Sequence, residues 1–214
     1  MMSLSSDTSR EESVNGSVVK IVMLGQAGCG KTSIVMRYIE DTFTPNTCTT
    51  IGAAFFLKTA LINNKPINIR LWDTSGQERF QSLIPLYYRY AAAALLVFDP
   101  SDTLSLSKLK YWQNELENNC EQLPLIVIVA NKIDLDFSIE QKSILLKVQN
   151  YAKQSQIPFF QTSAKTGESI QNLFRSVLEK VVEEQKIKTY QEKTEWDESF
   201  VTNKNSTHSN KWCC

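Results

Sequence analysis

The chain has 214 residues, 42% of them hydrophobic, which is enough for one well-packed domain with tails. Its 23 basic and 23 acidic residues cancel. No overall field attracts nucleic acid, so we expect no nucleic acid partner. The only histidine, His208, lies near the C-terminus. A histidine-dependent catalytic triad or a His-ligated zinc site inside the central domain is therefore excluded.

The cysteines and the N-terminus indicate a reducing compartment. The number of cysteines is odd and, apart from the terminal pair, their spacing is not that of metal ligands. Residues 1–17 are polar, without the apolar segment of a signal peptide. We therefore expect a cytosolic setting and no structural disulfide. The five cysteines are Cys29, Cys48, Cys120, Cys213 and Cys214.

The chain begins with a Ser/Asp/Glu-rich extension, residues 1–17, that we expect to be disordered. From residue 18, short apolar runs alternate with longer amphipathic stretches. The apolar runs predict six strands, at residues 18–24, 54–62, 67–72, 92–98, 125–130 and 158–162. The amphipathic stretches predict helices at residues 31–40, 104–118, 140–154 and 169–186. This alternation predicts an α/β fold, a mostly parallel six-stranded sheet with helices on both faces. The polar turn at residues 63–65 predicts one antiparallel edge strand.

Directly after the first strand comes a complete GxxxxGK[ST] phosphate-binding loop, Gly25 to Thr32. In such a loop backbone N–H groups surround phosphate, Lys31 reaches the outer phosphates and the hydroxyl of Thr32 ligates Mg²⁺. The loop therefore predicts a nucleoside triphosphate ligand. The residues predicted here to bind the nucleotide are Gly25, Ala27, Gly28, Cys29, Gly30, Lys31, Thr32 and Ser33.

The strand at residues 67–72 is followed by a second motif, Asp73-Thr-Ser-Gly76-Gln77. A carboxylate at the end of a strand can hold Mg²⁺ through water, and the backbone N–H of Gly76 can approach the γ-phosphate. The side chain of Gln77 can then orient the attacking water. A plain polar turn explains this short motif equally well when it is considered alone.

Two further motifs follow later strands and predict the base. Guanine presents two neighbouring N–H donors, which one carboxylate, Asp134 of Asn131-Lys132-Ile-Asp134, can accept, and adenine cannot satisfy that carboxylate. Lys132 can lay its aliphatic stem over the base. The stretch Ser163-Ala164-Lys165 can offer a backbone N–H to guanine O6. Four motifs in this order, each after a predicted strand, indicate guanine nucleotide rather than ATP.

These motifs together resemble those of the small Ras-like GTPases, and more narrowly the Rab branch. The resemblance runs from about residue 20 to residue 180. It rests on the stretches Thr50-Ile-Gly-Ala-Ala-Phe55, Leu71-Trp-Asp-Thr, Gly76-Gln-Glu-Arg-Phe80, Tyr87-Tyr-Arg-Tyr-Ala91 and Cys213-Cys214. The sequence of residues 50–56 is most similar to that of the early-endosomal Rab subgroup. The resemblance implies a P-loop small G domain over residues 18–186 and a flexible tail over residues 187–214.

The resemblance also implies roles for single residues. Thr50 corresponds to the switch I threonine that joins Thr32 on Mg²⁺ and senses the γ-phosphate. Phe43 corresponds to an aromatic that packs on the guanine edge, although a loop aromatic tucked against the core fits the sequence equally well. Phe55, Trp72 and Tyr87 correspond to a cluster that presents the nucleotide state to effectors. Trp72 could equally be core, but a cluster spanning both switches favours an exposed binding surface.

Two features bear on the hydrolysis rate. Ala27 stands where the Ras family often has glycine, and bulk there crowds the catalytic glutamine, which corresponds to Gln77. Residues 42–51 contain no arginine, so switch I supplies no arginine finger. Intrinsic hydrolysis is then expected to be slow, on the order of 10⁻⁴ s⁻¹, until a partner donates the missing charge.

The last residues, Cys213-Cys214, resemble the double-cysteine ending that Rab proteins carry for geranylgeranylation. Two lipids anchor a protein stably where one does so marginally. The four lysines and four acidic residues of the tail cancel, so the lipids must supply most of the membrane affinity. The implied location is the cytoplasmic face of intracellular membranes, endosomal ones among them, with cycling through the cytosol.

The resemblance implies a monomeric switch of vesicle traffic. Its implied partners are an exchange factor, a GTPase-activating protein, a GDP dissociation inhibitor, the Rab escort and prenylation machinery, and effectors of the GTP state. Two other functions remain open from the residues alone. One is a GTP-locked scaffold with negligible hydrolysis, for which only Ala27 argues, and the other is a P-loop kinase or ATPase, against which Asp134 argues.

Overall fold

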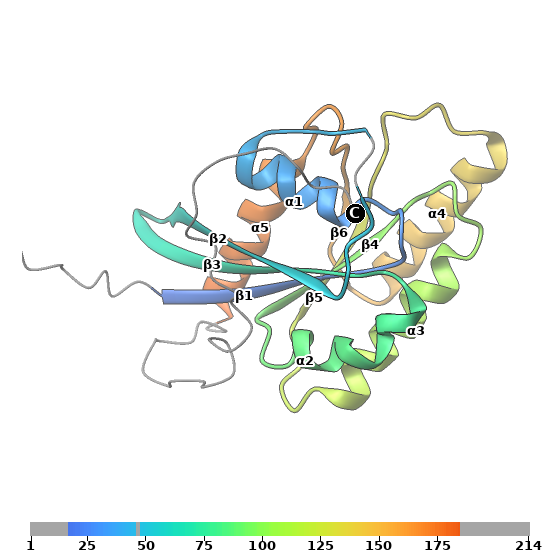
Figure 1. The fold of residues 1–214 in the computed structure, drawn as a ribbon. Coiled ribbons are helices and arrows are strands. Elements are labelled where there is room, and N and C mark those ends of the chain that lie inside the picture. Colours follow the sequence, from blue (N-terminus) through green and yellow to red (C-terminus); the bar gives the residue numbers. More distant parts are fainter. Residues whose placement is uncertain (1–16, 46–47, 185–214) are drawn as a thin grey trace, which may run out of the picture.

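The computed structural model describes residues 17–45 and 48–184. Nearly all of the predicted N-terminal extension, the predicted tail with Cys213 and Cys214, and His208 lie outside the described residues. In chain order the strands are β1 (Ser17–Leu24), β2 (Ala53–Ile62), β3 (Lys65–Thr74), β4 (Ala93–Phe98), β5 (Leu125–Ala130) and β6 (Phe159–Gln161). The helices are α1 (Lys31–Glu40), the 3-10 helix η1 (Glu78–Leu83), α2 (Ile84–Tyr88), α3 (Ser105–Asn119), α4 (Ile139–Gln154) and α5 (Ile170–Glu183). Figure 1 shows their arrangement.

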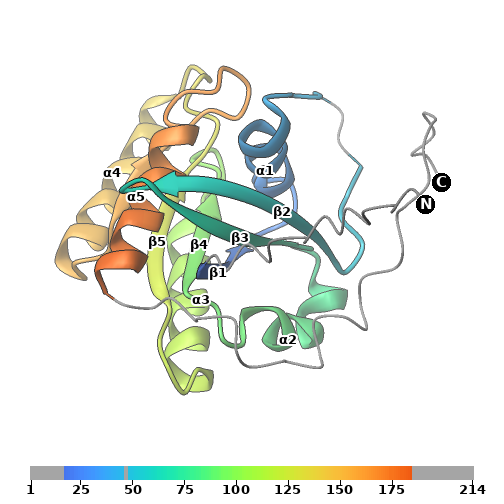
Figure 2. The same ribbon diagram turned by 90° about the vertical axis from the view of Figure 1, so that its left-hand side faces the viewer.

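The six strands form one sheet in the order β2-β3-β1-β4-β5-β6. All neighbours are parallel except β2 and β3, which form the antiparallel edge hairpin (Figure 2). The predicted α/β sheet with one antiparallel edge strand is therefore confirmed. Strands β4 and β5 are buried along their whole length, as continuous apolar strands of a parallel sheet should be.

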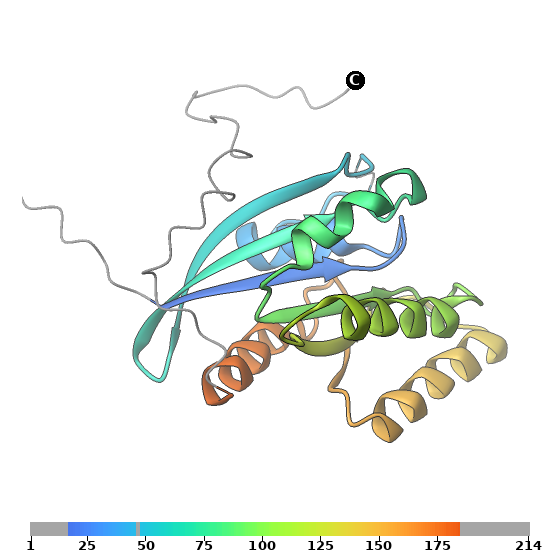
Figure 3. The ribbon, with the colours of Figure 1, turned by 90° about the horizontal axis from the view of Figure 1, so that it is seen from below.

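Helices cover both faces of the sheet and create two hydrophobic cores. On one face, α1 and α5 pack against residues of β1 and β3 such as Ile21 and Ile69, and the rings of Tyr38 and Phe174 stack with centroids 3.8 Å apart. The other face is covered by α2, α3 and α4 (Figure 3). These helices bury Tyr88, Trp112 and Val148 together with strand residues such as Leu96. The central strands are thus held between two apolar layers.

The sequence did not predict the segment 78–88, which forms η1 and α2. Helix α2 has only five residues, with proline at its start, and buries Ile84 and Tyr88 alone. Such a short segment has too few turns to show a helical period. No helix among residues 17–45 and 48–184 combines the length and apolar character needed to cross a bilayer.

Candidate nucleotide-binding site

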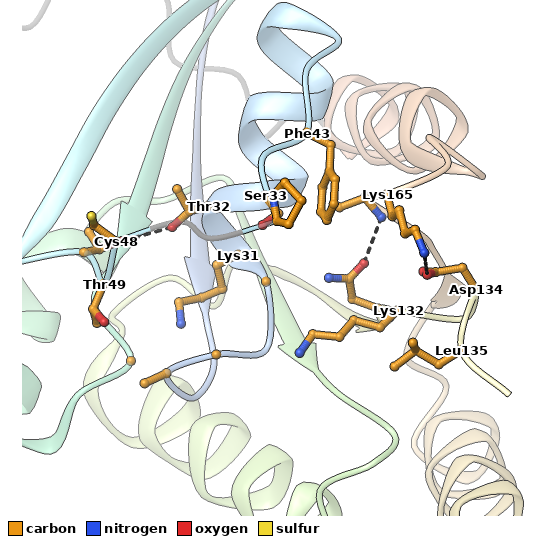
Figure 4. Close-up of a pocket in the computed structure, with 18 of the residues that line it drawn as sticks. Lys31, Thr32, Ser33, Phe43, Cys48, Thr49, Lys132, Asp134, Leu135 and Lys165 are labelled. Carbon is orange, nitrogen blue, oxygen red and sulfur yellow. Dashed lines mark hydrogen bonds and ion pairs between the residues drawn. The ribbon is translucent and has the colours of Figure 1, made fainter. Parts of the chain in front are cut away.

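A cavity of about 420 Å³ opens at the edge of the sheet formed by the carboxyl ends of its parallel strands, beside the loops that follow β1 and β3 (Figure 4). This is the edge of an open parallel sheet at which ligands bind. The loops after α1, β5 and β6 form its other walls. The lining residues are Ala27, Gly28, Gly30, Lys31, Thr32, Ser33, Phe43, Pro45, Cys48, Thr49, Thr50, Thr74, Gly76, Asn131, Lys132, Asp134, Leu135, Ala164 and Lys165.

The phosphate-binding loop ends where α1 begins. Gly30 has φ +94°, in the left-handed region, and a Cβ there would lie 2.3 Å from Nδ2 of Asn131, so glycine is required on both counts. The loop thus turns the first N–H groups of α1 toward the cavity, which favours an anion. Lys31 is 5% exposed, and its ammonium donates to the carbonyls of Gly25 and Gln26 at 2.8 Å each.

Three oxygen-bearing side chains converge beside the loop. The hydroxyl of Thr32 donates to Oδ2 of Asp73 at 2.6 Å and lies 2.9 Å from the hydroxyl of Thr50, which also donates to Oδ2 at 3.3 Å. Burial raises the pKa of Asp73, opposed by the hydrogen bonds and by Lys31. Oδ1 of Asp73 is buried without a hydrogen-bond partner among the described residues. Hard oxygen ligands with one buried oxygen unpaired fit Mg²⁺.

Gly76 brings the loop after β3 against the phosphate-binding loop. The carbonyl of Gly76 accepts from the N–H of Ala27 at 3.1 Å, and a Cβ on Gly76 would lie 2.0 Å from that nitrogen. Gln77 does not line the cavity. Its side-chain oxygen accepts from Nε of Arg79 at 2.6 Å, and it lies at a separate hollow of about 150 Å³ beside α3, with Tyr111.

Asn131 joins three of the predicted motifs. Its Nδ2 donates to the carbonyl of Cys29 at 3.0 Å, and its Oδ1 accepts from the N–H of Ala164 at 3.2 Å and from Oγ1 of Thr162 at 3.3 Å. The side chain is 1% exposed. It therefore fixes the distance between the phosphate-binding loop and the loop after β6.

Asp134 is held from the same loop. Its Oδ1 accepts from the hydroxyl of Ser163 at 2.6 Å, and its Oδ2 lies 3.7 Å from Nζ of Lys165. Lys132 has φ +67°, and its ammonium pairs with Oδ2 of Asp99 at 2.8 Å. The paired, oriented carboxylate of Asp134 is suited to accept from two neighbouring N–H donors.

The side chain of Phe43 projects into the cavity from the loop after α1, opposite Lys132 (Figure 4). It also packs against the core. Its position is therefore compatible both with packing on a guanine base and with the role of a loop aromatic tucked against the core.

Besides Gln77, four of the residues predicted to bind nucleotide or Mg²⁺ do not line the cavity. Gly25 and Cys29 lie at a different hollow, and Asp73 and Ser163 are fully buried. Burial raises the pKa of the Cys29 thiol, opposed by Lys31.

The sequence analysis missed five lining residues. Three of them are direct neighbours of predicted residues, so extending each motif by one residue would have found them. Cys48 lies two residues before Thr50, and Pro45 lies two residues after Phe43. They are Pro45, Cys48, Thr49, Thr74 and Leu135.

The three predicted effector aromatics are in contact. The ring centroids of Phe55 and Trp72 lie 5.1 Å apart, and those of Trp72 and Tyr87 lie 5.5 Å apart. Trp72 is only 8% exposed, whereas Phe55 and Tyr87 are half-buried. The expectation of an exposed Trp72 is therefore wrong, because its ring packs between those of Phe55 and Tyr87. The accessible part of the cluster is Phe55 and Tyr87.

Comparison with known proteins gives a consistent result. A sequence model of the Ras family matches residues 20–183. The chain is 41% identical to the GTP-binding protein YPT53 of Saccharomyces cerevisiae over 167 residues, 76% of each chain. It is 38% identical to the Ras-related protein Rab5 of Nicotiana tabacum, over 76% of this chain and 80% of that one. It is also 38% identical to the Ras-related protein Rab-18-B of Danio rerio, over 77% and 80%.

Proposed function

Because the chain belongs to the Ras family of small GTPases, and within it to the Rab proteins, we propose that it is a guanine-nucleotide switch of vesicle and endosomal membrane traffic. Members of this family hydrolyse GTP and bind GTP or GDP with Mg²⁺. Neither the kinase nor the non-hydrolysing scaffold is favoured by this membership. The similarity to Rab5-type proteins supports the endosomal part of the proposal.

One observation carries the proposal. Five loops far apart in the sequence contribute to one cavity, with the phosphate-binding loop at one end and Asp134 at the other. Asn131 and Ser163 hold three of these loops, the phosphate-binding loop and those after β5 and β6, in a fixed relation. A cavity with a phosphate end and a guanine-selective end fits a guanine nucleotide and little else.

At the phosphate end, each residue has a role. The N–H groups at the start of α1 and the ammonium of Lys31 stabilise the phosphates, and the ammonium exchanges its bonds to Gly25 and Gln26 for bonds to phosphate oxygens. Thr32, Thr50 and Asp73 would hold Mg²⁺, which neutralises the charge that develops on the β- and γ-phosphates when it is bound.

Hydrolysis requires Gln77 to orient a water molecule for attack on the γ-phosphate. Its side chain must first leave Arg79 and turn toward the cavity. Residues 42–51 contain no arginine, so a stabilising positive charge comes from an activating partner. The intrinsic reaction is accordingly slow, and the bound nucleotide acts as a timer.

The switch depends on the two loops that meet the γ-phosphate. Thr50 holds one of them, and Gly76, hydrogen-bonded to the phosphate-binding loop, holds the other. Release of the γ-phosphate removes their shared anchor, so both loops and the adjacent Phe55 and Tyr87 change arrangement. Effectors bind this surface in the GTP state.

Rab proteins in general work with exchange factors, activating proteins, GDP dissociation inhibitors and effectors. We propose that this chain uses all of these as a monomer and is delivered to membranes by the Rab escort and prenylation machinery. Geranylgeranyl groups on Cys213 and Cys214 anchor it at the cytoplasmic face of endosomal membranes, while residues 18–186 act as the G domain and residues 187–214 as the tail. Replacing both cysteines by serine should leave nucleotide binding intact and abolish membrane association.

The decisive experiment measures nucleotide choice. Purified protein in Mg²⁺ should bind GTP and GDP and reject ATP. Asp134→Asn should shift the preference from guanine to xanthine. Xanthine presents one N–H donor and one carbonyl acceptor where guanine presents two donors, and an amide can accept from the first and donate to the second. Binding of ATP by the wild type, or unchanged base choice in the variant, would contradict the proposal.

A further inference from the structure

The guanidinium of Arg37 connects two loops that surround the base end of the cavity, although Arg37 itself is not among the residues that line the cavity in the described chain. Arg37 lies in the last turn of α1 and its side chain is 16% exposed. It therefore acts on any ligand only through the backbone that it holds.

On one side, Arg37 holds the loop after β6. Its Nε donates to the carbonyl of Ala164 and its Nη2 to the carbonyl of Lys165, each at 2.9 Å. The turn at Gly167 packs against the stem of Arg37, since a Cβ at Gly167 would lie 3.6 Å from Cδ of Arg37. Asn131 holds the N–H of Ala164 from the opposite direction. The loop is thus fixed from both sides.

On the other side, Arg37 holds the start of the loop that carries Phe43. Its Nη1 donates to the backbone carbonyl of Asp41 at 2.8 Å and to Oδ1 of Asp41 at 3.0 Å. Asp41 ends α1 with φ +55°. The chain must turn sharply here to bring Phe43, two residues later, over the cavity.

We propose that Arg37 is a positioning residue for nucleotide retention: by holding Ala164, Lys165 and Asp41 together, it keeps the two base-contacting loops closed and slows release of guanine nucleotide. The planar fork of arginine suits this task, because it donates in several fixed directions at once. Lysine carries the same charge but cannot bind both loop carbonyls in that geometry. The inference rests on the proposed function, since it assumes a guanine base in the cavity.

The test uses the full-length protein loaded with fluorescent GDP. Arg37→Met keeps the aliphatic stem and removes every donor, and Arg37→Lys keeps the charge. Arg175→Met is the matched control, because Arg175 pairs with Glu179 on the exposed face of α5. We expect release of GDP to accelerate at least roughly tenfold in Arg37→Met, by an intermediate factor in Arg37→Lys, and not in the control.

A second measurement separates positioning from loss of stability. 6-thio-GDP replaces O6 by sulfur, a weaker acceptor, and keeps both donors that Asp134 accepts. If Arg37 positions the loop that meets O6, the preference of the wild type for GDP over 6-thio-GDP should shrink in Arg37→Met and persist in the control, as in a double-mutant cycle. General destabilisation would weaken both nucleotides by the same factor.

The outcomes are distinct. Unchanged GDP release from a folded Arg37→Met or Arg37→Lys protein, or an unchanged preference over 6-thio-GDP, overturns the inference while leaving the switch function intact. A wild-type protein that binds no guanine nucleotide refutes the proposed function instead.

Discussion

At the scale of single residues, several polar side chains in or beside this site hold other parts of the protein in place. Asn131 is 1% exposed and bonds to two other motifs. Asp99 pairs with Lys132, and Ser163 orients Asp134. A buried polar group that lost its partner would cost about 1–3 kcal/mol. The geometry at the base therefore depends on contacts within the protein and not only on contacts with a ligand.

Asp99→Asn should release GDP roughly three- to tenfold faster, because Lys132 loses a charged partner at 2.8 Å. The effect is modest since Lys132 is 36% exposed. Asp102→Asn is the control, as Asp102 pairs with Lys108 instead. Equal release rates for the wild type and Asp99→Asn would show that Lys132 is positioned without Asp99.

The pH dependence of this contact has a definite sign. Burial alone would raise the pKa of Asp99, but hydrogen bonds from Lys132 and Ser101 outweigh it and leave the pKa below its ordinary value. The contact is then complete above the ordinary carboxyl pKa and is lost as pH falls through the lowered value. The ratio of release rates between Asp99→Asn and the wild type should therefore stay constant between about pH 5 and pH 8.

Gln77→Leu should bind GTP normally and lose on the order of 10²-fold in hydrolysis stimulated by an activating protein, because leucine cannot orient water. Single-turnover phosphate release measures this. Arg79→Met serves as a comparison, since it frees Gln77 from its present partner. If Gln77→Leu hydrolyses GTP as the wild type does, water is oriented by another group.

At the scale of elements, helices and strands with a clear sequence pattern could be predicted, and short segments without such a pattern could not. Helix α1 and strand β5 begin and end at the predicted residues, because a phosphate-binding loop and an unbroken apolar run mark their limits. The segment 78–88 was missed, since η1 and α2 are too short for a period.

The sequence motifs located most of the cavity, but they could not reveal Arg37 or Asp99. Each contacts residues far away in the chain, 127 positions away for Arg37 and Ala164. No local pattern carries such a pairing. The burial of Trp72 was likewise decided by packing between β2, β3 and α2, which the alternation of a single strand does not specify.

Phe174→Ala should destabilise the domain by about 3–5 kcal/mol, because Phe174 is fully buried and stacks on Tyr38 between α5 and α1. Chemical denaturation of the GDP-bound protein measures this. Leu146→Ala on α4 is the control: Leu146 is 57% exposed, so its change should stay within about 0.5 kcal/mol. Similar losses for both variants would contradict the described packing of α5.

At the scale of the whole molecule, the cavity is built from the ends of strands that both cores support. Its walls come from segments between residues 27 and 165, so a ligand there contacts most of the length of the domain. Binding must consequently favour the folded state as a whole rather than a single loop.

GDP with Mg²⁺ at about one hundred times its dissociation constant should stabilise the protein by about 2.7 kcal/mol. For a domain of this size the melting temperature should rise by roughly 5–10 °C. Thermal unfolding followed by circular dichroism measures the shift, and ADP with Mg²⁺ at the same concentration is the control. An equal shift with ADP would mean that the base contributes nothing to affinity.

Trp72 has a consequence for observing this molecule. Its indole ring lies between Phe55, which follows the loop carrying Thr50, and Tyr87, which follows the loop carrying Gly76. The ammonium of Lys20 lies 5.3 Å from the centre of the same ring. Indole emission responds to neighbouring charge and stacking, so one native fluorophore touches the elements leading from both loops. We therefore expect the emission of Trp72 to change when GDP is exchanged for GTP, over the background of the other three tryptophans of the chain.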